Sequence, residues 1–255
     1  MIKAKIFSFV LLTLIVLIYA SSAFAKNITL AKASTLIPQG WSAIDSDDIK
    51  FKKNTTVILN DTGQVIEGVL NSDTYLRPLG WHSLVNDHFY VENTTNFFPS
   101  RFFRSFGHSC GVVLPAYGHI RYKGNSTVRF AADGTVIKGT IDHPVIIQIR
   151  PDSYGFVRFK DETILSFYAN GTIKLGTLDK DTLLRPLGWE NNLDSTNAGF
   201  IEFKSGSPII FSENGYVIQG MPKHNTPWHN APDNNQLNAK TIYIFNTENA
   251  EKVTN

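Results

Sequence analysis

The sequence predicts an all-β fold: an array of about four three-stranded β-hairpin units with one short helical, aromatic insertion. Three observations lead to this prediction. A pair of glycines at fixed spacing recurs four times, apolar residues surround each pair at constant distances, and a twelve-residue segment ending in tryptophan occurs twice with little change. Such recurrence is typical of chains whose units bury their apolar faces by stacking on one another.

The glycine pairs indicate tight hairpin turns. At four places two glycines stand five residues apart, and the first of them ends the segment N-D-T-G, A-A-D-G, Y-A-N-G or S-E-N-G. An Asp or Asn beside a glycine that can adopt positive φ favours a type I turn closed by a bulge. The pairs are Gly63 and Gly68, Gly134 and Gly139, Gly171 and Gly176, and Gly215 and Gly220.

Four apolar columns around each turn define the strands. Relative to the first glycine, an aromatic ring stands twelve residues before, an aliphatic residue six before, a large apolar residue four before, and Val or Ile two after. The two positions at six and four before share one face of a strand. Each unit therefore reads as a short strand, a turn, a second strand, the Asx-Gly turn and a third strand. Because Val65 and Leu70 differ in parity, we expect a β-bulge at the second glycine. The aromatic column is Phe51, Tyr122, Phe159 and Phe203.

A P-x-G-W tail ends the recurring segment. Residues 70–81 and 178–189 are identical at nine of twelve positions, and residues 30–41 form a looser copy. Proline ends a strand ladder, and glycine lets the indole fold back on the sheet. The tryptophans either pack in the core or form a row that binds carbohydrate or peptide. The candidate ligand-binding residues are Trp41, Trp81, Trp189 and Trp228, the last following Thr226 and Pro227.

At F-Y-A-N-G-T-I-K-L-G-T-L, residues 167–178, the chain resembles the MORN family and its bacterial antitoxin-like relatives, whose hairpins carry Y-x-N-G-x-x-x-x-G. The resemblance covers about a dozen residues in each of four units. It departs from the family in the irregular spacing of the glycine pairs and in the P-L-G-W tail. The resemblance implies a hairpin-built scaffold for protein or membrane contact, and it implies no catalytic residue.

Residues 82–119 separate an N-terminal region, 26–81, from a C-terminal region, 120–228, and are either an insertion or a degenerate unit. Phe98, Phe102 and Phe106 recur every four residues within this segment, which predicts a short helix whose apolar stripe packs on the sheet or contacts a partner or membrane. A polar loop, a closing strand near 241–245 and a tail occupy 229–255.

Residues 107–111 match G-x-S-x-G, the nucleophile elbow of α/β-hydrolases, with Ser109 as the nucleophile. That elbow needs a following helix, whereas the next residues include Pro115 and indicate extended chain. A thiol nucleophile would use Cys110 with a neighbouring histidine. We favour a non-catalytic protein, and a secreted serine hydrolase using Ser109 is the alternative. No histidine spacing indicates a metal site and no motif indicates a cofactor, so we expect neither.

The N-terminus indicates export. Lys3 and Lys5 precede a mostly apolar stretch, 6–20, and residues 21–25 end in A-x-A, which predicts a signal peptide cleaved after Ala25. An uncleaved anchor is the alternative, but fifteen residues fall short of the roughly 20 that span a bilayer. Two of the 24 basic residues lie in this segment, so the remaining chain has 22 basic and 22 acidic residues.

Zero net charge argues against a nucleic-acid partner. We expect an exported binding or structural module, periplasmic, cell-surface or secreted, with no stable membrane span after cleavage. Its partner would be an unknown protein or a glycan.

Overall fold

The computed structural model describes residues 25–42, 49–81, 118–149, 156–193 and 198–253, which are nearly all β-strands and turns. The prediction of an all-β fold is therefore confirmed. The predicted phenylalanine helix, Ser109 and the G-H-S-C-G segment all lie outside the described residues.

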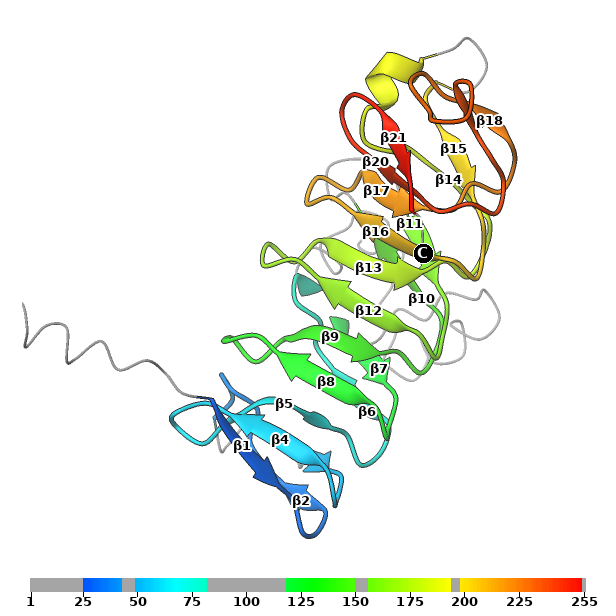
Figure 1. Ribbon diagram of the computed structural model, residues 1–255. Coiled ribbons are helices and arrows are strands. Elements are labelled where there is room, and N and C mark those ends of the chain that lie inside the picture. Colours follow the sequence, from blue (N-terminus) through cyan, green and yellow to red (C-terminus); the bar gives the residue numbers. More distant parts are fainter. Residues whose placement is uncertain (1–24, 43–48, 82–117, 150–155, 194–197, 254–255) are drawn as a thin grey trace, which may run out of the picture.

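One antiparallel sheet of eleven strands runs the length of the molecule (Figure 1). Hairpin follows hairpin in this sheet, because each hairpin's second strand pairs with the first strand of the next. The strands in spatial order are β1 (Lys26–Thr29), β4 (Thr56–Leu59), β5 (Val65–Val69), β8 (Thr127–Phe130), β9 (Val136–Thr140), β12 (Ile164–Phe167), β13 (Ile173–Thr177), β16 (Pro208–Phe211), β17 (Val217–Gly220), β20 (Tyr243–Phe245) and β21 (Ala250–Lys252).

Five short antiparallel pairs lie along the same axis beside the hairpins (Figure 1). Inward side chains of these pairs and of the long sheet form one continuous apolar core. The pairs are β2 (Ser34–Thr35) with β3 (Lys50–Phe51), β6 (Thr74–Leu76) with β7 (Ile120–Tyr122), β10 (Val145–Gln148) with β11 (Phe156–Phe159), β14 (Thr182–Leu184) with β15 (Ile201–Phe203), and β18 (Thr226–Pro227) with β19 (Gln236–Leu237). A 3₁₀-helix, η2 (Trp189–Asn192), follows β14.

The four expected three-strand units are all present: β3–β4–β5, β7–β8–β9, β11–β12–β13 and β15–β16–β17. Two parts of the arrangement were not expected. A short strand from the segment before each unit adds a fourth member to it, and β20 pairs not only with β17 but also with β21, which makes a fifth hairpin.

The long sheet is continuous across the interrupting segment. β5 pairs directly with β8, and β6 pairs with β7 over Thr74 to Leu76 in the same way that β14 pairs with β15. No strand of the described residues stands between the first and second hairpins.

The second glycine of each pair makes room for the aromatic ring of its unit. A Cβ atom built on Gly176 would lie 2.3 Å from Phe159 Cδ1, and one on Gly139 would lie 2.6 Å from Tyr122 Cδ1. These rings are fully buried. The glycine and the ring therefore form one packing unit, joining two columns of the sequence.

The predicted bulge exists, but the predicted position was wrong. The register shifts immediately after the tight turn, where Leu59 pairs with Val65 and Ile58 with Glu67, leaving Ile66 unpaired. The other three hairpins that carry a glycine pair shift at the same place. The alternation of core-facing side chains along the strand therefore changes before Gly68, and the turn itself causes this change.

The P-x-G-W tail joins two hairpins and does not merely close its own unit. Pro78 bridges Val136 of the β8–β9 hairpin, and two residues later Gly80 meets Gly171 in the turn of the next hairpin. A Cβ on Gly80 would lie 2.4 Å from the Gly171 carbonyl oxygen. Gly40 and Gly188 approach the turns at 132–134 and 246–247 in the same way. Glycine is needed because backbone touches backbone there.

Candidate functional site

A groove of about 560 Å³ opens between two successive tails near the N-terminal end of the molecule. One wall is Trp41 with the hairpin turn 133–135, and the other is residues 74–77, which comprise β6 and Arg77. Gly40, Ile49, Trp81 and His119 complete the lining. This volume is within the range of known ligand sites, and the mixture of rings with a few polar groups is typical of them.

The groove contains two of the four predicted tryptophans. Trp41 and Trp81 are half-buried and line it. Trp41 is fixed in place, because its indole Nε1 donates a hydrogen bond to the Gly134 carbonyl at 2.8 Å. The Arg77 guanidinium lies over the Trp81 ring, 4.5 Å from its centroid. Both indoles therefore have defined orientations before a ligand arrives.

The other two tryptophans lie elsewhere. Trp228 is only 4% exposed and packs edge-on against Phe245, so its assignment to a ligand surface was wrong and it belongs to the core. Trp189 is half-buried and does not line the groove; the Arg185 guanidinium lies 3.9 Å from its ring centroid, and Gly199 lies close to the ring. The core alternative therefore holds for Trp228, and Trp41 and Trp81 stay the candidates for a binding surface.

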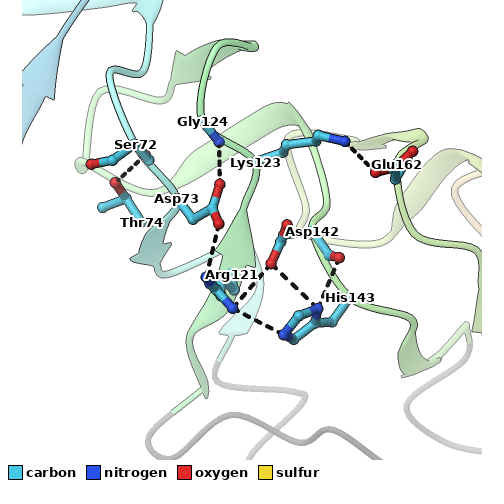
Figure 2. Close-up of polar contacts among 9 residues, drawn as sticks. All are labelled: Ser72, Asp73, Thr74, Arg121, Lys123, Gly124, Asp142, His143 and Glu162. Carbon is cyan, nitrogen blue, oxygen red and sulfur yellow. Dashed lines mark hydrogen bonds and ion pairs between the residues drawn. The ribbon is translucent and has the colours of Figure 1, made fainter.

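A polar cluster lies at the β6–β7 pair (Figure 2). Arg121 pairs with Asp73 at 2.8 Å and with Asp142 at 3.1 Å, and its Nη1 contacts His143 Nε2 at 3.0 Å. Asp73 also accepts a hydrogen bond from the Gly124 backbone N–H at 2.8 Å. Each charged side chain of this cluster has a partner inside the cluster, which indicates a structural role: it fixes the strand that forms one groove wall.

A second aspartate, Asp181, fixes a short strand pair in the same way further along the chain. Asp181 accepts a hydrogen bond from the Ser205 backbone N–H at 2.7 Å and pairs with Lys223 at 3.0 Å. The Ser205 hydrogen bond and the Lys223 ammonium lower the pKa of Asp181 to about 2. Stability from this carboxylate is present above the ordinary pKa of 3.8 and is lost as the pH falls toward 2.

We therefore expect Asp181→Asn to be less stable than the native chain at pH 7 and to lose less stability between pH 5 and pH 2. Only the native side chain has an ionised form to protonate in that window. Urea unfolding midpoints at both pH values measure the effect. Asp61→Asn, at an exposed turn position, is the control and should follow the native chain. Equal acid sensitivity of native and Asp181→Asn would contradict the expectation.

The described residues contain no group of three or more His, Cys, Asp or Glu side chains able to hold a metal ion. Within these same residues no helix has the length and apolar character to cross a bilayer. Catalysis by Ser109 or Cys110 stays a prediction.

No family model matches the chain, and neither a curated protein nor a solved structure shows significant similarity to it. Its class is thus defined by its own architecture: an all-β protein whose antiparallel hairpins form one long sheet beside a row of short strand pairs. The resemblance to the MORN family stays a prediction.

Sequence reasoning missed the groove residues Tyr75, Arg77, His119 and Asp133. Arg77 had a usable signal, since L-R-P-L-G-W recurs with its arginine four residues before the tryptophan. His119 and Asp133 had none, because chain pairing alone brings them beside a segment more than 35 residues earlier in the sequence.

Proposed function

We propose that this chain is an exported, non-catalytic repeat protein that binds a partner macromolecule through the groove between Trp41 and Trp81. The observation that carries the proposal is the groove itself: two oriented indoles, Tyr75 and a small set of polar side chains converge on one concavity. Rigid aromatic anchors in a concave site are the residues that most often dominate binding energy.

Removal of residues 1–25 would leave every described strand intact, because the first of these strands, β1, begins at Lys26. The partner would be a protein segment, and a glycan is the other outcome that the test below distinguishes.

The test uses the mature chain, residues 26–255, and two probes: a phage-displayed library of random dodecapeptides and an array of neutral and acidic oligosaccharides. We expect a binder from one probe whose affinity falls at least about tenfold in Trp81→Ala and in Tyr75→Ala. Tyr75 is 48% exposed, so its truncation removes little core packing. Fluorescence anisotropy or calorimetry gives the affinities.

Trp189→Phe is the control, because Trp189 belongs to the same P-L-G-W tail but lies outside the groove. It should bind as the native chain does. Circular dichroism confirms that each variant is folded. Binders that are indifferent to Trp81→Ala and Tyr75→Ala, or no binder from either probe, would overturn the proposal.

A further inference from the structure

One wall of the groove is a strand edge that no other described strand pairs with. β6 pairs with β7 alone among the described strands, in a two-stranded ladder. Four consecutive residues, 74–77, line the groove. Successive side chains of a strand point to opposite faces: Leu76 is 1% exposed in the core, whereas Tyr75 is 48% exposed. Because the groove contacts both Tyr75 and Leu76, it runs along the edge of the strand and not over one of its faces.

Part of the β6 backbone faces away from β7. Backbone groups of successive residues point to opposite edges, so at least one of its three residues directs its N–H and C=O away from β7. Beyond β6 the edge is closed, because the Arg77 carbonyl accepts a hydrogen bond from Val136 N at 2.8 Å. The open edge is therefore short and ends beside the Arg77 side chain.

Arg77 differs from the neighbouring arginines in its charge partners. Arg121 pairs with Asp73 and Asp142, and Arg158 pairs with Asp179. Within the part of the chain that the structure describes, Arg77 makes no ion pair, and its guanidinium lies over the Trp81 ring. Stacking occupies a guanidinium's face, while the N–H donors at its edge stay suited to two parallel hydrogen bonds with a carboxylate.

We propose that the groove takes an extended peptide, which adds to the open edge of β6 as a strand and places a carboxylate against Arg77. This proposal rests on the binding function proposed above. Strand addition uses backbone hydrogen bonds for affinity and side-chain pockets for selectivity. Here the open edge of β6 offers the backbone groups, and the Arg77 guanidinium and the flanking indoles offer the side-chain contacts. An oligosaccharide has no peptide backbone to pair with the strand edge.

Peptides selected from the dodecapeptide library on the mature chain provide the first test. We expect them to share an Asp, a Glu or a dependence on the free C-terminal carboxylate. Arg77→Gln should weaken binding of such a peptide at least about tenfold. It should not weaken binding of the same peptide with Asn or Gln, or an amidated end, in place of that carboxylate. Arg129→Gln is the matched control, since Arg129 lies on β8, away from the groove, and should leave both affinities unchanged.

The backbone is tested with N-methylated versions of the selected peptide. Strand addition predicts that N-methylation abolishes binding at one or two positions of a three-residue core and is tolerated at the neighbours, because only alternate N–H groups face β6.

Uniform tolerance of N-methylation would overturn strand addition, and equal loss of affinity for both peptides in Arg77→Gln would overturn the role of Arg77. If oligosaccharides bind and compete at the groove while no peptide does, the peptide proposal fails and the binding function stands. If neither probe binds, both fail.

Discussion

Replacing Gly80 by alanine should lower the free energy of unfolding by roughly 3 kcal/mol, through overpacking together with the strain of a positive φ. The new Cβ would lie 2.4 Å from the Gly171 carbonyl oxygen, and Gly80 has a φ of +78°. The obstructing atom is backbone, which no rotamer change can move. Urea unfolding followed by circular dichroism measures the effect.

Gly63→Ala separates the two contributions. Gly63 has a nearly equal φ of +81°, but a Cβ there has no neighbour within 4 Å. It should therefore show the strain alone, about 1 kcal/mol. If Gly80→Ala were no more costly than Gly63→Ala, the contact between the tail and the next hairpin would contribute nothing to stability. Because Gly80 precedes Trp81, the same variant should also weaken binding in the groove.

This contact shows why part of the fold could not be read from the sequence. The P-x-G-W pattern predicts a chain that must stop pairing and turn, since proline removes a donor and glycine adds freedom. Nothing in the pattern says which backbone the glycine will touch, because Gly171 lies 91 residues further along the chain. The short strands β6, β10 and β14 were missed for a related reason: with three or four residues each, they carry too little alternation to be recognised.

The hairpins, in contrast, were predictable because their determinants are local. Strand, Asx-Gly turn and returning strand fall within about a dozen residues, and the turn residues specify the geometry that follows. The bulge was misplaced because parity showed that the face switches between Val65 and Leu70 but could not show where. The register shows that the switch occurs at Ile66, directly after the turn.

For the groove, the sequence predicted that tryptophans are present better than it predicted how buried each tryptophan is. Trp41 and Trp81 follow P-x-G and line the groove, whereas Trp228 follows Thr226-Pro227 without a glycine and is buried. That missing glycine was a signal that Trp228 differs. Trp189 carries the full motif but lies outside the groove, where its half-buried ring contacts Arg185 and Gly199. Only the folded chain distinguishes these two cases.

The pairing of a ring with a glycine should have the largest effect on stability. Truncating Phe159 to alanine should cost about 4 kcal/mol, because the ring is fully buried and packs edge-on against Phe211 at 6.3 Å between centroids. Gly176→Ala should cost about 2 kcal/mol by overpacking, since its Cβ would lie 2.3 Å from the Phe159 ring.

The two substitutions together test whether they act on one contact. With the ring removed, the Cβ at position 176 has no ring to displace, so the double variant should cost about 2 kcal/mol less than the sum of the single changes. Phe159→Ala combined with Gly63→Ala is the matched pair, and it should be additive because Gly63 lies in a different hairpin and touches no neighbour. Additivity in both pairs would mean that glycine is required at position 176 for its backbone alone. Coupling confined to the first pair would mean that the aromatic ring and the second glycine form a single interaction, made once in each unit. That interaction explains why the two sequence columns occur together in all four units.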